Sequence, residues 1–185
     1  MGQDKSSLLL GNRTLFVRAI EIANAVGDGV FVVGRRTGLE AAAANAGVSI
    51  IEDEFAGQGP LAGIHAALKA SSTDLNFILA VDTPFVTPAF VRYLVQRAAR
   101  TDALVVVPQT GAHLHPLCAI YRRAFAAIAE KALAAGKNKI DALFSSAVAD
   151  FVTEEELTNA GFSVSMFDNV NSPEDFVRAE ARLRG

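Results

Sequence analysis

Residues 75–85, LNFILAVDTPF, decide the fold. The stretch 75–81 is almost continuously apolar, which is typical of a strand that is buried on both faces of its sheet. Helices must then cover both faces, so the run predicts an α/β protein. Asp82 follows directly. The chain therefore places a carboxylate at the carboxyl end of an apolar strand, where burying its charge is costly unless something pairs with it.

Other apolar runs of strand type alternate with helix-like segments along the chain. Thr14, Thr37 and Thr87 precede helical segments and are expected N-caps. The pattern predicts one domain over residues 1–185, with a three-layer α/β fold and a mostly parallel sheet. Further strands are expected at 29–33, 48–51, 103–107 and 117–121, and helices at 15–26, 39–46, 60–70, 88–99, 123–136, 140–146 and 173–185.

Composition excludes several classes of protein. Half of the residues are apolar (51%), yet no apolar run approaches the roughly 20 residues that cross a bilayer, and no secretion signal is visible. The single cysteine, Cys118, excludes an internal disulfide and fits a reducing cytoplasm. A net charge of −3 without a basic stripe argues against nucleic-acid binding, while a small anionic ligand stays possible.

Asp53, in IIEDEFAGQGPLAG, lies just past a predicted strand and before a helix that begins at Pro60. Ligands of open α/β sheets bind at the carboxyl ends of strands. Glycines such as Gly59 let the backbone approach a ligand, and the helix N-terminus offers free N–H groups. The alternative is an ordinary turn with a solvated Asp53.

Asp82 is a natural ligand for Mg²⁺, which takes one or two carboxylates and leaves positions for water and phosphate oxygens. The alternative is an N-cap or Asx-turn before the Thr-Pro step. Lys5, in MGQDK, is a possible phosphate ligand or a solvated lysine of a frayed terminus.

Asn169 and Asn171, in FDNVNSPEDF, flank Val170 and point the same way if the segment is extended. Two amides on one face can orient hydroxyls or metal-bound waters. Alternatively, Asn171 or Ser172 only caps the last helix.

The histidines give weak signals. His65 lies within a predicted helix and is expected to be a helix-face residue. His113 and His115 share an i, i+2 face, but no third ligand for zinc is suggested. Cys118 is expected in the core.

Taken together, the order MG-x-DK-x-x-L, ED…GPLAG, DTPF, HPLCAIYRR and NVNSPEDF resembles the molybdenum cofactor guanylyltransferase (MobA) family over nearly the whole chain. The resemblance implies a nucleotide-diphospho-sugar-transferase-like, Rossmann-like fold. It also implies transfer of GMP from GTP to molybdopterin, with release of pyrophosphate, Mg²⁺ as cofactor and molybdoenzymes as possible clients.

The resemblance also implies site roles. The nucleotide would be bound by Lys5, Gly34, Asp53, Gly59 and Asp82, with Asp82 holding the metal and Lys5 and Asp82 acting in catalysis. The pterin side would include His115, beside Pro116, and Asn169 and Asn171 would lie near metal and phosphates. Gly34 stands where the family often carries an asparagine directed at the nucleotide.

Family members begin with a strand and a stretch resembling LAGG-x-S-x-R, whereas this sequence begins at MGQDK. MGQDK therefore resembles the back half of a nucleotide loop, and Met1 would be an internal methionine if the start was assigned too late. A chain that truly starts at Met1 is expected to bind GTP poorly. Submicromolar GTP binding by the 185-residue chain would contradict this.

Two other functions fit the residues. One is another nucleotidyltransferase on the same fold, such as a molybdopterin cytidylyltransferase, because short motifs encode base choice poorly. The other is a non-catalytic relative that binds the cofactor or a client molybdoenzyme.

Overall fold

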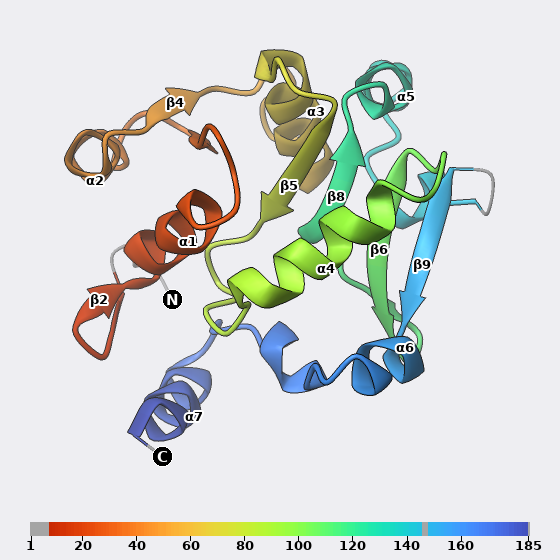
Figure 1. Ribbon diagram of the computed structural model, residues 1–185. Helices are drawn as coiled ribbons and strands as arrows, with labels where there is room; N and C mark the ends of the chain where they lie inside the picture. The colour runs from red at the N-terminus through yellow and green to blue at the C-terminus, as the bar shows by residue number, and fades with distance from the viewer. Residues whose placement is uncertain (1–7, 146–147, 185) are drawn as a thin grey trace.

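The run at 75–81 forms strand β5 (Leu75–Leu79) of a five-stranded sheet in the computed structural model, which describes residues 8–145 and 148–184 (Figure 1). The sheet order is β5-β8-β6-β7, and β9 pairs with β6. Its other members are β6 (Val105–Thr110), β7 (His113–Leu114), β8 (Cys118–Arg122) and β9 (Ala149–Thr153).

Strand direction follows from the pairings. β8 is antiparallel to both β5 and β6, and β9 is parallel to β6. Strands β5, β6 and β9 therefore run the same way, so the predicted α/β class is confirmed and its parallel character lies in these three strands. The inserted β8 and the short β7 run the other way.

A second, parallel sheet consists of β3 (Phe31–Val33) and β4 (Ser49–Ile51). Among the described residues no strand pairs with both β3 and β5, so the two sheets are separate. A short antiparallel hairpin, β1 (Leu9–Leu10) and β2 (Arg13–Thr14), precedes the first helix, where the sequence predicted no strand at all.

Helices start largely where the sequence signals them. The Thr14 and Thr87 hydroxyls accept hydrogen bonds from the amides of Val17 (3.2 Å) and Phe90 (3.3 Å), as expected of N-caps. The helices are α1 (Leu15–Asn24), α2 (Glu40–Ala46), α3 (Pro60–Ala70), α4 (Pro88–Ala98), α5 (Phe125–Ala134), α6 (Glu154–Asn159) and α7 (Pro173–Arg184), with 3-10 turns at Val164–Phe167 and Asp141–Leu143.

Two predictions about helices were wrong. Thr37 does not cap α2, because Leu39 occupies the N-cap position and makes no side-chain hydrogen bond there. The expected helix at 140–146 is only the 3-10 turn Asp141–Leu143, whose flanking residues Ile140 and Phe144 contribute to the hydrophobic core.

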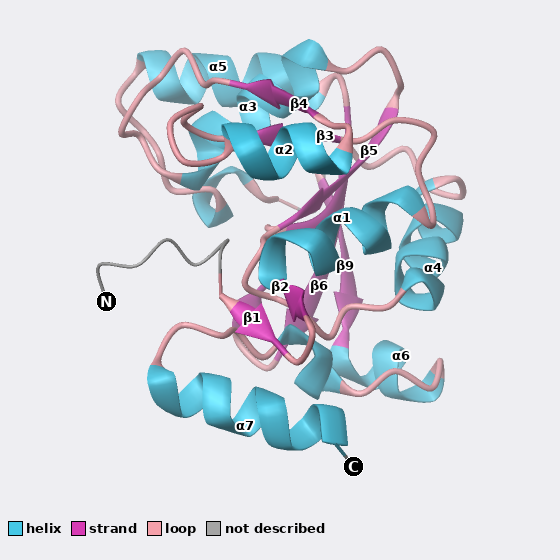
Figure 2. Cartoon of the chain, turned by 90° about the vertical axis from the view of Figure 1, so that its left-hand side faces the viewer, coloured by secondary structure: helices cyan, strands magenta, loops and turns pink. Residues whose placement is uncertain are grey.

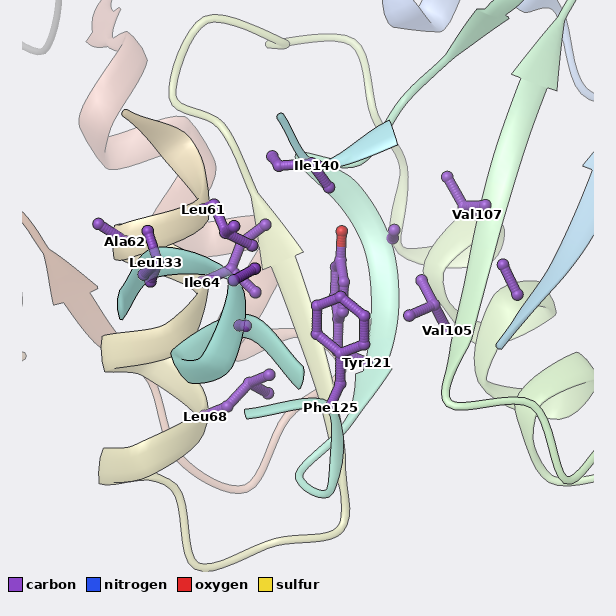
Figure 3. Packing of buried hydrophobic residues seen from close by; sticks show 14 residues of the cluster. Leu61, Ala62, Ile64, Leu68, Val105, Val107, Tyr121, Phe125, Leu133 and Ile140 are labelled. Carbon is purple, nitrogen blue, oxygen red and sulfur yellow. The ribbon is translucent and has the colours of Figure 1, made fainter. Parts of the chain in front are cut away.

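The sheet lies between two helical layers, as predicted: α4 crosses one face, and α3 and α5 cover the other (Figure 1). Alternation along each strand produces this arrangement. In β8, Ala119 and Tyr121 pack toward α3 and α5, while Cys118 and Ile120 pack toward α4. Figure 3 shows the Tyr121 ring within the first of these clusters.

Strand β9 and helix α6 were missed by the sequence reasoning. Asp150 interrupts the apolar pattern of β9, but its carboxylate receives two hydrogen bonds from Arg97, at 2.7 and 2.9 Å, which compensates its burial. Helix α6 begins with a capping box between Thr153 and Glu156. The pairing of Arg97 with Asp150 is a long-range contact that no local pattern signals.

None of the helices in the described ranges combines the length and the apolar character that crossing a membrane requires.

Shortening a core side chain between the sheet and its helices should destabilise the fold. Leu68 of α3 is 0% exposed (Figure 3), so Leu68→Ala is expected to lower the free energy of unfolding by about 2–5 kcal/mol in urea titrations. Leu183→Ala, at a position 41% exposed, serves as the control and should change it by less than about 1 kcal/mol. Equal losses in the two variants would contradict this account of the core.

Candidate active site

Asp82 lies just beyond β5, where the chain turns toward α4. The Ala80 amide donates to the Leu117 carbonyl (2.8 Å), and the Ala80 carbonyl accepts the Thr83 hydroxyl (2.9 Å). The first bond continues the pairing with β8 for one residue beyond the strand, and Asp82 is half-buried at the carboxyl edge of the sheet. Thr87 caps α4, so Asp82 is not the N-cap of that helix.

Residues 169–171 lie against the backbone of Asp82. The Val170 amide donates to the Asp82 carbonyl at 2.9 Å. Val170 is 2% exposed and packs in a cluster with Leu10 and Leu15, whereas Asn169 and Asn171 on either side are exposed. The two amide side chains therefore alternate with a buried residue, as the sequence predicted.

The start of α7 holds the same segment from its other end. The Ser172 hydroxyl accepts a hydrogen bond from the Asp175 amide (3.1 Å), and the Asp175 carboxylate accepts from the amides of Ser172 (2.8 Å) and Asn171 (3.0 Å). These bonds lower the pKa of Asp175. Capping by Ser172 is thus confirmed, and it fixes the backbone of Asn171 as well.

His115 is held in the turn between β7 and β8. Its Nε2 lies 2.8 Å from the Thr110 hydroxyl, and its ring stacks on Phe167, with ring centroids 4.0 Å apart. The Tyr121 hydroxyl donates to the Pro116 carbonyl at 2.8 Å and so braces the turn from the core side. Burial, with a smaller contribution from His113, lowers the pKa of His115.

These contacts bring one group of predicted site residues together. Asp82 contacts the 169–171 segment through Val170, and His115 contacts Phe167, two residues before Asn169. We call Asp82, His115, Asn169 and Asn171 the carboxylate group.

A second group gathers at the carboxyl ends of β3 and β4. The Gly34 amide donates to the Ile51 carbonyl (3.0 Å), extending the parallel pairing to the residues before Asp53. A Cβ on Gly34 would come 3.0 Å from Leu39 Cδ1, so a larger residue there would displace Leu39. Helix α3 contacts both strands, which brings Gly59 to the same region. We call Gly34, Asp53 and Gly59 the glycine group.

The glycine group has unused hydrogen-bonding capacity. Asp53 Oδ1 is buried and has no hydrogen-bond partner among the described residues, although a buried acceptor normally has one. Gly59, at φ +73°, is the N-cap of α3 and offers no side chain to cap it. A donor group of a ligand would satisfy Asp53, and an anionic group would suit the helix start.

Other candidates fall outside these groups. Lys5 lies outside the described residues. His65 is fully buried on α3, where its ring packs edge-to-face with the Phe55 ring, and Cys118 is in the core as expected. His113 is exposed in β7, and no cluster of three or more His, Cys, Asp or Glu side chains within 8–145 and 148–184 could hold a metal ion.

A hollow at the opposite edge of the sheet lies away from both groups. It is lined by the end of α4 and by the beginning of β9, including Arg97, Arg100 and Asp150. Arg97 there is already paired with Asp150 and Glu156. Ligands of open α/β sheets bind at the other, carboxyl edge.

Sequence reasoning missed the residues that hold the site in place. Phe167 reaches His115 from a distant part of the chain, whereas Thr110 and Tyr121 stand five positions from their partners His115 and Pro116. Nothing in the local sequence sets any of the three apart. Among these stabilising residues, only Asp175 could have been recognised from the sequence, because it stands three residues after Ser172, the spacing of a capping box.

The chain matches the MobA-like NTP transferase domain over residues 1–150. It is 34% identical to a probable molybdenum cofactor guanylyltransferase of Pelotomaculum thermopropionicum, over 97% of this chain and 85% of that protein. The chain belongs to the MobA-like NTP transferase family. A molybdenum cofactor guanylyltransferase of Desulfosudis oleivorans is 30% identical over 99% of this chain and 89% of its own length.

Solved structures agree with the family fold. Molybdopterin-guanine dinucleotide biosynthesis protein A of Archaeoglobus fulgidus superposes with a TM-score of 0.86 and 26% identity, over 99% of this chain and 92% of that one. The 2-C-methyl-D-erythritol 4-phosphate cytidylyltransferase of Thermus thermophilus, at 19% identity and a TM-score of 0.66 over 98% of this chain and 94% of that one, shares the fold alone. The predicted nucleotide-diphospho-sugar-transferase-like fold is therefore confirmed.

The lowered pKa of His115 should make stability depend on pH. The ordinary pKa of a histidine is 6.5, and below that pH the unfolded chain takes up a proton at His115 that the folded protein resists. The contribution of His115 to the free energy of unfolding is therefore complete above pH 6.5 and declines as the pH falls toward the lowered pKa of the folded protein. His115→Phe keeps a ring on Phe167 and removes the titrating group. Between about pH 7.5 and about pH 5.5, urea titrations should show a larger drop in the free energy of unfolding for the wild type than for the variant. Equal drops would contradict the lowered pKa of His115.

Proposed function

We infer that this protein is a molybdenum cofactor guanylyltransferase, which transfers GMP from GTP to molybdopterin and releases pyrophosphate. Its family membership supports the reaction. The observation that carries the site is the hydrogen bond from the Val170 amide to the Asp82 backbone carbonyl, which brings the segment with the two asparagines next to the residue that carries the carboxylate.

The proposed chemistry needs positioning more than acid–base catalysis. A phosphate oxygen of molybdopterin attacks the α-phosphorus of GTP, and the bond from that phosphorus to the bridging oxygen of the β-phosphate breaks. The electron pair leaves with pyrophosphate. Since the attacking phosphate is already ionised, no strong general base is required, and rate comes from in-line alignment and stabilised charge.

The residues of the carboxylate group fit Mg²⁺. Asp82 would supply one carboxylate, and Asn169 and Asn171 would supply amide oxygens, which are hard ligands of the kind Mg²⁺ prefers. A single carboxylate would suit this ion, since Mg²⁺ usually keeps several waters and takes phosphate oxygens of the substrate. When bound, Mg²⁺ offsets the negative charge that develops on the departing pyrophosphate.

The glycine group would bind the nucleoside part of GTP. The buried Asp53 Oδ1 lacks a donor among the described residues, and a donor group of the guanosine could supply one. Gly34 and Gly59 let backbone approach the nucleotide. Lys5 would contact phosphates, as its motif implies.

The pterin would lie on the side of His115. Its lowered pKa keeps this imidazole neutral near pH 7, so it can exchange hydrogen bonds without adding charge. A cytoplasmic location and delivery of the product to client molybdoenzymes belong to this proposal. The single cysteine, Cys118, is consistent with that compartment.

Replacing the carboxylate of Asp82 should remove most of the activity. With molybdopterin and Mg²⁺, pyrophosphate release should occur with GTP and not with CTP, ATP or UTP at millimolar concentration. Asp82→Asn is expected to lower kcat by about 10²- to 10³-fold, because the isosteric amide cannot offset the charge of a metal–nucleotide complex.

Asp102→Asn is the matched control, since Asp102 is exposed at the opposite edge of the sheet. It should retain the wild-type rate. Preference for CTP would support the cytidylyltransferase alternative, no release with any nucleotide would support a non-catalytic role, and normal turnover by Asp82→Asn would overturn the site assignment.

A further inference from the structure

Arg182 of helix α7 contacts two segments next to the carboxylate group: the loop after Asp82, at Phe85, and the segment before Asn169, at Ser165 and Asp168. We propose that Arg182 is a positioning residue for the proposed guanylyl transfer: it holds the Asp82 loop and the 169–171 segment at the separation at which both can serve one ligand. This rests on the proposed function, because the ligand is the metal–nucleotide complex inferred above.

The first contact of Arg182 is with the Asp82 loop. Its guanidinium lies over the Phe85 ring, 4.1 Å from the ring centroid, within the range of a favourable cation–π interaction. Phe85 follows Asp82 by three residues in DTPF and is partly buried. Because the turn between them is short, fixing Phe85 limits where Asp82 can move.

The second contact is with the segment that leads to Asn169. Arg182 Nη1 donates to the Ser165 carbonyl at 2.7 Å and lies 3.8 Å from a carboxylate oxygen of Asp168. This part of the chain also carries Phe167, on which His115 stacks. One guanidinium therefore connects the loop after β5 with the turn that precedes the two asparagines.

Within residues 8–145 and 148–184, the ion pairs of the other two arginines of α7 stay on that helix. Arg178 pairs with Asp175, and Arg184 pairs with Glu180, both on the same helix. Their side chains are 73% and 78% exposed, against 38% for Arg182. Figure 2 shows α7 beside the β1–β2 hairpin, consistent with the contact between α7 and β1, so the helix that carries Arg182 is itself anchored.

The bridge needs the shape of arginine. A planar guanidinium can stack on a ring with its face while its edge donates hydrogen bonds, whereas the lysine ammonium is a compact charge that cannot do both in the same way. Arg182→Met removes the charge and the donors but keeps an unbranched side chain. Arg182→Lys keeps the charge, and Arg184→Met on the same helix is the matched control.

Kinetics test the effect on the site. Arg182→Met is expected to lower kcat by about 10- to 100-fold, since misplacing catalytic groups by about 1 Å costs this much. It should also raise the Mg²⁺ concentration for half-maximal rate, while the KM for GTP at saturating Mg²⁺ stays within about twofold because the glycine group is untouched. Arg182→Lys should recover part of the loss, and Arg184→Met should behave as wild type.

A double-mutant cycle tests the route. Phe85→Leu removes the ring under the guanidinium and should reproduce part of the Arg182→Met defect. If the two residues act together, the double variant should be little worse than Arg182→Met alone. Fully additive losses would overturn the bridge.

Amide hydrogen exchange gives a readout that needs no activity. In Arg182→Met, exchange should become faster in peptides covering 82–88 and 164–172, while a peptide covering 105–110 in β6 keeps wild-type protection. Uniformly faster exchange would mean a general loss of stability, and unchanged exchange would mean no positioning; either overturns the inference.

The two proposals can fail separately. A wild-type protein without guanylyl transfer would end the proposed function, while the exchange experiment would still decide whether Arg182 holds the two segments. An active wild type with an Arg182→Met variant equal to Arg184→Met would end this inference alone.

Discussion

The hydrogen bond from the Val170 amide to the Asp82 carbonyl is the constraint on which the carboxylate group depends. It ties a segment near the end of the chain to the loop that follows strand β5. The bond is protected because Val170 is buried with Leu10 and Leu15, so water cannot compete for it. With Val170 facing inward, the two neighbouring asparagines must face outward beside Asp82.

The protein separates two tasks that phosphoryl chemistry requires. The glycine group offers backbone and a buried carboxylate oxygen without a partner among the described residues, which suits recognition of neutral donor groups. The carboxylate group offers hard oxygen ligands, which suit a cation. Both lie at carboxyl ends of parallel strands, where helices begin and backbone N–H groups are available.

Precision at the site comes from residues that would not contact the substrate. Ser172 and Asp175 fix the start of α7, and the Tyr121 hydroxyl fixes the turn at Pro116. Arg182 adds a bridge between loops that the sheet itself does not connect. Such bridges matter because loops lack the regular backbone hydrogen bonds that fix the conformation of helices and strands, so side-chain contacts must fix it instead.

The sequence by itself determined the α/β class, most element starts and most candidate residues, because buried strands, N-caps and motif spacing are local properties of Asp82, Thr14, Thr87 and their neighbours. It did not determine strand β9, whose Asp150 breaks the apolar pattern and is compensated by Arg97 from another element. Only the tertiary structure decided that Asp82 meets Val170 and that β8 runs antiparallel between β5 and β6. The physical reason is that these contacts join residues far apart in the chain. A hydrogen bond or a ring stack between distant segments produces no periodic pattern in the sequence of either segment.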